Sequence, residues 1–174
     1  MSGPRYPEGW CIEVLDKSHP RAKFESGTSE VDAWLKKSAL QSQTKHLTTS
    51  KVLLDENRQI AGYYSLAFSQ IDFSDLPVDV AKKLPRRQLP VSVLAWLGVD
   101  RGFQGRGIGR RLLATALVDC YEASQTFAFI AVILDCMDEQ AKRFYQRFDF
   151  DELPGYPMRL YLPFKSLEAL VKGD

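Results

Sequence analysis

The pattern of apolar and polar positions changes character twice between residues 91 and 121. A mostly apolar run over residues 91–99 gives way to a polar, glycine-rich segment over residues 100–107. Apolar residues then recur at three- and four-residue spacing: Ile108, Leu112, Leu113, Ala116, Leu117, Cys120 and Tyr121. This spacing places them on one face of a helix. The pattern therefore predicts a buried strand, a glycine-rich turn and a helix, in that order.

Further strands and helices are predicted on both sides of this unit. Strand-like segments occupy residues 11–15, 51–55, 60–70, 127–136 and 156–164, and the second and third of them flank a short polar turn typical of a hairpin. The run over residues 127–136 is continuously apolar, which predicts a central strand buried on both faces. Helices are expected within residues 29–40, 78–84, 138–148 and 166–172. Residues 1–9 are expected to form a loose arm, and residues 41–49 and 85–90 to be connections.

Composition describes an ordinary globular protein. The chain has 174 residues, 45% hydrophobic and 26% charged, which suits a single domain over residues 1–174. No stretch of 18 apolar residues occurs and the N-terminus has no signal-peptide pattern, so we expect neither a membrane span nor export. Cys11, Cys120 and Cys136 lack metal-binding spacing, which favours reduced thiols in a cytoplasmic protein and no metal site.

Charge is unevenly distributed along the chain. The formal net charge is +1, yet residues 82–111 carry eight basic residues against Asp100 alone, a local charge of +7. The basic residues are Lys82, Lys83, Arg86, Arg87, Arg101, Arg106, Arg110 and Arg111. A phosphate-rich ligand would use some of these charges, and a second polyanion such as RNA could use others. A solvated charged face is the alternative interpretation for Lys82, Lys83, Arg86 and Arg87.

The glycine-rich turn suits a phosphate ligand. It brings free backbone N–H groups to the positive end of a helix dipole, and glycine lets a ligand approach closely. No Lys-Ser or Lys-Thr follows Gly109, so the turn is not a P-loop. The series Gly105, Gly107, Gly109 is one residue short of the dinucleotide fingerprint. A strand–helix turn with no ligand remains the alternative.

Gln104, Gly107 and Gly109 fit the pattern Gln/Arg-x-x-Gly-x-Gly/Ala. This pattern resembles the acetyl-CoA loop of the GNAT (Gcn5-related) N-acetyltransferases. The resemblance implies an α/β fold, with a mixed sheet of about six to seven strands flanked by about four helices. It also implies acetyl-CoA as the cofactor. The pyrophosphate contacts would come from Gln104, Gly105, Arg106, Gly107, Ile108, Gly109 and Arg110, and the backbone of Leu97, Gly98 and Val99 would pair with the pantetheine arm.

The resemblance also implies that Tyr145 is the catalytic acid. A phenol of pKa about 10 can return a proton to the leaving thiolate. The alternative is a core aromatic residue on an amphipathic helix. The family usually has Gly-Phe after this helix, whereas here Asp149 precedes Phe150; aspartate tolerates the left-handed conformation that ends a helix. No general base is evident, because His19 and His46 lie outside the motifs and are expected at the surface. A water molecule, or an amine arriving unprotonated, would take that role.

A wider series of residues resembles the GNAT toxins of bacterial toxin–antitoxin pairs. It comprises FESG at 24–27, VDAWL at 31–35, IAGYYSL at 60–66, PV at 90–91, LGVD at 97–100 and FY at 144–145. Those enzymes acetylate the α-amino group of aminoacyl-tRNA and block translation. They pair with a small ribbon-helix-helix antitoxin, and many form homodimers. Under this hypothesis the acceptor would contact Trp96, Lys82, Lys83, Arg86 and Arg87, with Trp96 beside the acetyl pocket.

Two other hypotheses stay open from the sequence. One is a GNAT enzyme that acetylates a small amine, a protein lysine or a protein N-terminus. The other is a catalytically silent acyl-CoA-binding module, which the presence of Gln104, Gly107, Gly109 and Tyr145 disfavours.

Overall fold

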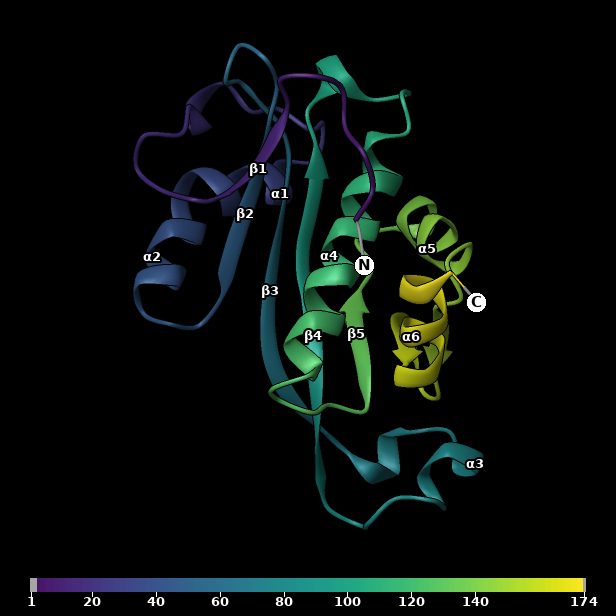
Figure 1. Ribbon diagram of the computed structural model, residues 1–174. Helices are drawn as coiled ribbons and strands as arrows, with labels where there is room; N and C mark the ends of the chain where they lie inside the picture. Colours follow the sequence, from purple (N-terminus) through teal and green to yellow (C-terminus); the bar gives the residue numbers. More distant parts are fainter. Residues whose placement is uncertain (1–2, 174) are drawn as a thin grey trace. The chain divides into compact units, whose positions relative to one another are not determined.

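A mixed seven-stranded sheet forms the framework of the computed structural model, which describes residues 3–173 (Figure 1). The strand order is β1-β2-β3-β4-β5-β7-β6. β4 and β5 pair in parallel, whereas β1 with β2, β2 with β3, β5 with β7 and β6 with β7 are antiparallel. The strands are β1 Cys11–Val14, β2 Thr49–Leu54, β3 Ile60–Asp72, β4 Gln88–Val99, β5 Ala131–Asp135, β6 Asp151–Leu153 and β7 Tyr156–Pro163. The mixed sheet expected from the family resemblance is confirmed.

The helical segments are more numerous than the sequence suggests. Among the described residues the α-helices are α1 Ser29–Ala33, α2 Ala39–Thr44, α3 Val78–Ala81, α4 Ile108–Ser124, α5 Glu139–Gln146 and α6 Phe164–Lys172. A π-helical segment, Trp34–Ser38, joins α1 to α2, so the first expected helix appears as three consecutive pieces. Short 3₁₀ turns occur at Arg21–Lys23, Phe73–Asp75 and Arg101–Phe103.

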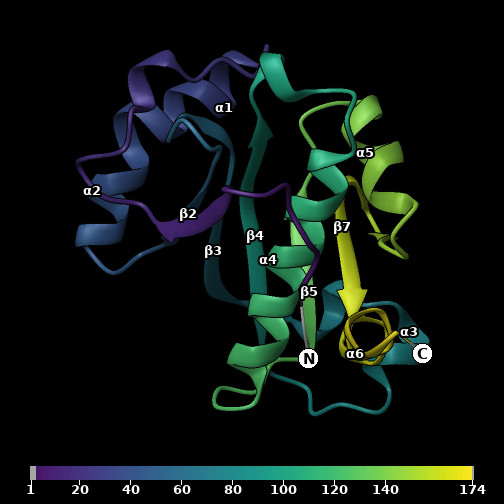
Figure 2. The same ribbon diagram turned by 45° about the horizontal axis from the view of Figure 1, so that its top comes forward.

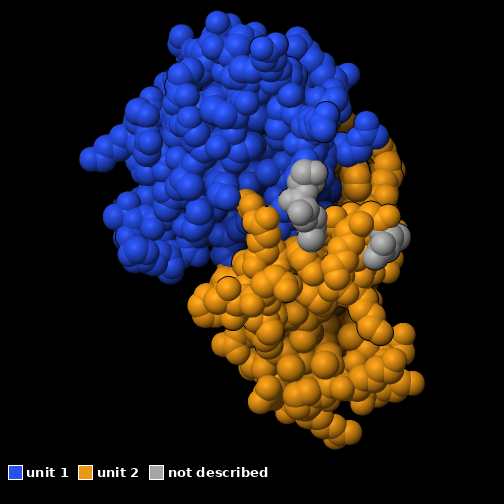
Figure 3. Space-filling view, in the orientation of Figure 1, with its two compact units in different colours: residues 1–67, 94–118 blue, residues 68–93, 119–174 orange. Residues whose placement is uncertain are grey.

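The chain divides into two compact units, which Figure 3 colours separately. Unit 1 contains Met1–Ala67 and Leu94–Val118, and unit 2 contains Phe68–Val93 and Asp119–Asp174. Each unit combines two separate stretches of chain, because β3, β4 and α4 each contribute residues to both.

The core of unit 1 lies between the first helical stretch and the sheet. Val31, Leu35 and Ala39 are buried on the inner face of that stretch, as their spacing predicts. They pack with Val52, Leu54, Ile60 and Tyr63 of β2 and β3. The Tyr63 hydroxyl donates to the Val31 carbonyl oxygen at 2.6 Å, which fixes α1 on the sheet. Figure 2 shows α1 and α2 beside these strands.

The core of unit 2 gathers residues from the end of β3, the segment after it, and strands β4 to β7. Its buried members are Ile71, Leu76, Leu89, Val91, Ala131, Leu153 and Tyr161. β5 and β7 pair in register from Ala131 with Pro163 to Asp135 with Arg159. Asp138 caps α5 by accepting a hydrogen bond from the Ala141 N–H at 2.8 Å, so its predicted place at the helix start is confirmed.

Several predicted boundaries are wrong. The run over residues 127–136 contains a strand only at Ala131–Asp135, and Phe127 is 67% exposed. The Phe127 N–H instead donates to the Ala123 carbonyl, which turns the chain directly after α4. Residues 41–44 remain helical, because the Gln43 side chain ties this turn to the Leu15 carbonyl and the Ser50 N–H. β4 already begins at Gln88, within the expected connection.

Two expectations about burial also need correction. His19 is buried, with its Nδ1 accepting from the Asp16 N–H and its Nε2 hydrogen-bonded to Glu13. On α5 the buried residue is Lys142, whose ammonium pairs with Glu152 of β6. The apolar residues that the sequence pattern predicts on the inner face of this helix are only half-buried: Ala141, Phe144, Tyr145 and Phe148. The short strand β6 was not expected at all.

The N-terminal segment contains neither helix nor strand over residues 3–9. It is attached to α4 through the Tyr6 hydroxyl, which lies 2.7 Å from the Thr115 hydroxyl. The first two residues of the expected arm lie outside the described residues. Over residues 3–173, no helix is long and apolar enough to cross a membrane.

Candidate active site

The strand, turn and helix predicted at the centre of the sequence are present in unit 1. β4 ends at Val99, and α4 begins at Ile108, which is buried. The glycine turn, residues 104–109, follows β4 and includes the first two residues of α4. Gly105 and Gly107 have φ angles of +79° and +75°, a conformation that costs other residues energy. The Gly107 carbonyl accepts from the Arg111 N–H, so the amides of the first turn of α4 have no partner within the helix.

Hydrogen bonds brace the glycine turn from both sides. The Asp100 carboxylate accepts from the Glu25 and Gly102 N–H groups, each at 2.9 Å. The Gln104 side-chain amide donates to the Ser26 carbonyl at 2.7 Å and to the Val99 carbonyl at 2.9 Å. Gln104 therefore fixes the turn against the loop before α1, a positioning role that its motif alone did not reveal.

Gly98 allows α1 to lie close to β4. A Cβ atom at this position would lie 2.5 Å from Val31 Cγ1, 3.4 Å from the Tyr63 ring and 3.5 Å from the Phe24 ring. Gly62 on β3 is similarly crowded, with an ideal Cβ 2.9 Å from the Gly98 carbonyl oxygen. The register of the parallel β4–β5 pair covers Ser92 and Val93, and Leu97 to Val99 lie farther along the strand.

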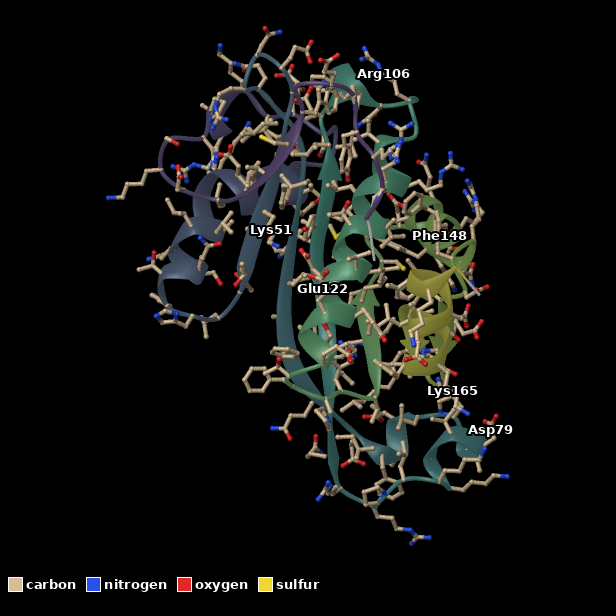
Figure 4. The ribbon with its side chains drawn as sticks, in the orientation of Figure 1. Lys51, Asp79, Arg106, Glu122, Phe148 and Lys165 are labelled. Atoms are coloured by element: carbon tan, nitrogen blue, oxygen red, sulfur yellow. The ribbon has the colours of Figure 1, made fainter. Side chains whose placement is uncertain are left out.

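Basic side chains surround the glycine turn. The Arg106 guanidinium donates to the Gly102 carbonyl and lies 5.5 Å from the centre of the Phe103 ring. Figure 4 shows Arg106 on the turn before α4. Arg110 is exposed, and its guanidinium lies 3.6 Å from an ideal Gly107 Cβ. These two cations and the helix dipole make the turn electropositive.

Trp96 belongs to an aromatic and hydroxyl cluster in unit 1. Its ring stacks on Trp34, with centroids 5.3 Å apart and planes 14° from parallel. The Trp34 indole N–H donates to the Ser65 hydroxyl at 2.9 Å, and that hydroxyl lies 2.6 Å from the Ser50 hydroxyl. The structure therefore adds Trp34 to the predicted Trp96. In the sequence, Trp34 appears only on an apolar helix face and within the VDAWL segment, residues 31–35, of the family resemblance.

Tyr145 lies on α5 in unit 2, where it is half-buried. Its ring makes edge contacts with Phe144, at 5.1 Å between centroids, and with Phe150, at 5.9 Å. Burial, followed by the nearby Cys136, raises the pKa of Tyr145 above its usual value of 10.0, so the phenol is protonated at neutral pH. Asp149 has a φ of +67°, which confirms the left-handed conformation predicted at the end of this helix.

The basic block of the sequence is divided between the two units. Lys82, Lys83, Arg86 and Arg87 are exposed in unit 2, after α3, and the Arg86 guanidinium lies 5.9 Å from the centre of the Phe73 ring. The other four basic residues of the block belong to unit 1. Thus unit 1 brings together Trp96, residues 97–99 and the glycine turn. Within residues 3–173 no cluster of three His, Cys, Asp or Glu residues could hold a metal ion.

Comparison with known proteins places this geometry in a family. The model of the acetyltransferase (GNAT) domain matches residues 48–152, a region that includes β4, the glycine turn, α4 and Tyr145. The chain belongs to the GNAT acetyltransferase family. It is therefore an acyltransferase by family, and the fold and cofactor class expected from its glycine turn are confirmed.

Relatives in this family cover almost the whole chain. A tRNA-acetylating toxin of Mycobacterium tuberculosis (strain ATCC 25618 / H37Rv) is 34% identical over 151 residues, which are 87% of this chain and 89% of the toxin. A solved structure of AtaT complexed with acetyl-methionyl-tRNAfMet has a TM-score of 0.85 and 28% identity, covering 92% of this chain and 98% of that one. A crystal structure of AtaTR bound with AcCoA has a TM-score of 0.83 and 27% identity, covering 93% and 98%.

Proposed function

We propose that this protein is a toxin-type N-acetyltransferase that moves the acetyl group of acetyl-CoA to the α-amino group of aminoacyl-tRNA and so inhibits translation. The observation that carries the proposal is the likeness, over nearly the full chain, to a tRNA-acetylating toxin. The braced glycine turn supports it, because such a turn would provide the cofactor site that this activity needs.

The residues of the glycine turn fit the diphosphate of CoA. An added Cβ at Gly105 would meet nothing within 4 Å, so there is open space beside the backbone amides. Gly105, Gly107, Ile108 and Gly109 would offer N–H groups, and Arg106 and Arg110 would supply positive charge. The backbone of Leu97 to Val99 would hold the pantetheine arm. Bound acetyl-CoA supplies an activated thioester acetyl group.

Tyr145 would act as the proton donor at its phenol oxygen. The burial of Tyr145 is compatible with this role, because it raises the pKa of the phenol and keeps the proton in place at neutral pH. The same property argues against Tyr145 as a base that takes the proton of the incoming amine.

The sequence motifs offer no evident general base, which favours an α-amino acceptor. An α-amino group of pKa about 7.8 is unprotonated in roughly one molecule in ten at pH 7, whereas a lysine of pKa about 10.4 is unprotonated in roughly one in 2,500. An aminoacyl-tRNA therefore presents a usable nucleophile without help from the enzyme. Acetylation of a small amine or a protein lysine is the competing activity.

The partners follow from the same proposal. They are acetyl-CoA, aminoacyl-tRNA, a small ribbon-helix-helix antitoxin and a second copy of the chain, in the cytoplasm. Trp96 and the exposed group Lys82, Lys83, Arg86 and Arg87 are the acceptor contacts that this proposal retains.

Expression in a bacterial host tests the proposed function. We expect growth arrest and loss of protein synthesis with the wild-type chain, and normal growth with Tyr145→Phe at equal protein level. Tyr156→Phe, on β7, is the matched control and should remain toxic. Normal growth with the wild-type chain, together with turnover of small amines in vitro, would replace the toxin assignment with the competing activity.

A further inference from the structure

A second site in unit 1 lies at a pocket of about 620 Å³ between the segment after β1 and the helix α2. Its lining includes the cations Lys17, Arg21 and Lys37, together with Asp16 and Gln41. We call this pocket the basic pocket. The lining contains no residue of the glycine turn. The pocket is therefore a separate feature from the cofactor site.

Arg21 has a buried donor without a partner. Its Nε is buried, and within the described residues it makes no hydrogen bond. A buried polar group of this kind costs free energy, and native proteins almost always satisfy it. The position of Arg21 is well fixed, because its N–H donates to the His19 carbonyl at 2.8 Å and its carbonyl accepts from the N–H of the core residue Phe24. Arg21 therefore lines the pocket from a fixed backbone position, and its guanidinium adds positive charge there.

The pocket carries uncompensated positive charge. Lys17 and Lys37 are exposed, and within residues 3–173 neither they nor Arg21 form an ion pair. Asp16 is the one carboxylate of the lining. Hydrogen bonds from the Ser18 hydroxyl and N–H lower its pKa and occupy its Oδ1. Three cations against one engaged carboxylate leave a net attraction for an anion.

The walls of the basic pocket are held in place before any ligand binds. His19 is buried and ties the Asp16 N–H to Glu13, which also pairs with Arg58. Gln43 connects the Leu15 carbonyl to the Ser50 N–H, both at 2.8 Å. A pocket that is already ordered loses little entropy on binding.

We propose that the basic pocket binds a phosphodiester group of the RNA acceptor, an inference that rests on the proposed function. A phosphate has several acceptor oxygens and takes short, charge-assisted hydrogen bonds from a guanidinium and from ammonium groups. The open surface of the pocket suits a phosphate that is part of a polymer. Such contacts position an RNA without reading its sequence, so the pocket would hold the acceptor for the unit that carries the cofactor turn.

Aminoacyl-tRNA kinetics test this inference with three variants. Arg21→Met and Lys37→Gln remove charge from the basic pocket, and Lys36→Gln removes an exposed charge from the same helical stretch outside it. We expect the first two variants to raise KM for aminoacyl-tRNA about tenfold, with kcat and the KM for acetyl-CoA unchanged. The slope of log affinity for tRNA against log salt concentration should become less steep by about 0.7 to 0.9, the value for one lost phosphate contact. Lys36→Gln should resemble the wild type. Equal KM values for all three variants would overturn the inference while the proposed function stands.

Thermal unfolding separates a binding role of Arg21 from a structural one. In saturating CoA, which occupies the cofactor turn, inorganic phosphate should raise the Tm of the wild-type protein more than that of Arg21→Met. Without phosphate, Arg21→Met should unfold at the wild-type temperature or higher, because an unsatisfied buried donor has been removed. A clearly lower Tm would make Arg21 a structural residue and contradict the inference. A wild-type protein that leaves tRNA unacetylated would overturn both this inference and the proposed function.

Discussion

The surroundings of Tyr145 hold its phenol in the form that gives a proton. Phe144 and Phe150 contact the ring, and burial raises its pKa above 10.0. An acid is active while protonated, so a raised pKa moves its loss of activity to higher pH. Gly107 acts in a different way, since its positive φ shapes the turn. In the proposed function, Tyr145 supplies a proton and Gly107 shapes the cofactor turn.

The pH dependence of acetyl transfer tests the state of Tyr145. We expect kcat to show no decline attributable to this residue between pH 8 and 10, because the protonated phenol persists above its usual pKa of 10.0. Tyr145→Phe should lower kcat by about 10² to 10⁴ throughout this range. Stopped assays at constant ionic strength measure both. An alkaline decline centred below pH 10 that disappears in Tyr145→Phe would contradict the assignment.

Substitution of Gly107 tests the glycine turn. Gly107→Glu should weaken acetyl-CoA binding by at least tenfold, because it brings a carboxylate and a strained φ to the diphosphate position. Gly107→Asn is the matched variant, since asparagine tolerates a positive φ and adds no charge. Isothermal titration with acetyl-CoA should rank wild type, Asn and Glu in that order. Unchanged affinity in Gly107→Glu would show that the cofactor lies elsewhere.

Among the elements, α1 and β1 determine how unit 1 is held together. α1 lies so close to β4 that only glycine fits at position 98. β1 carries Glu13, whose carboxylate oxygens accept hydrogen bonds from both terminal nitrogens of the Arg58 guanidinium, each at 2.9 Å. The same carboxylate contacts the buried His19. The first contact joins β1 to the turn between β2 and β3, and the second supports the segment that leads to Arg21.

A double-mutant cycle tests the contact between α1 and β4. Gly98→Ala should destabilise the protein by about 1 to 3 kcal/mol, because the new methyl group overlaps Val31 Cγ1. In a Val31→Ala background, where that atom is absent, the same change should cost less. Urea unfolding of the four proteins gives the coupling. Equal costs in both backgrounds would show that the clash is relieved in another way.

Acid unfolding tests the Glu13 network on β1. Hydrogen bonds from Arg58 and then His19 lower the pKa of Glu13 from its usual 4.5 to about 2. A depressed carboxylate pKa contributes stability above pH 4.5 that is lost as the pH falls toward 2. The Tm of the wild type should therefore fall more steeply over this window than that of Glu13→Gln. Parallel curves would mean that the network adds no pH-dependent stability.

At the scale of the whole molecule, local sequence patterns predicted the parts that depend on local chemistry. The strand–turn–helix unit, the cap at Asp138 and the left-handed Asp149 all follow from nearby residues. Lys142 was missed because its burial depends on Glu152 of a strand that the sequence did not reveal. The unsatisfied Nε of Arg21 likewise carries no motif.

The division into two units was also beyond the sequence pattern. Each unit is assembled from two distant stretches of chain, and periodicity along the chain does not report which stretches pack together. For the same reason, the basic block of residues 82–111 reads as one feature in the sequence although its members belong to both units.

The most direct test of the proposed function is acetyl transfer from labelled acetyl-CoA to a mixed pool of aminoacyl-tRNAs, with Tyr145→Phe measured in parallel. We expect label on the α-amino group of one or more amino acids, released with the amino acid when the ester is hydrolysed and greatly reduced in the variant. An enzyme that binds acetyl-CoA, acetylates small amines or lysines and leaves every aminoacyl-tRNA unlabelled would contradict the proposed function.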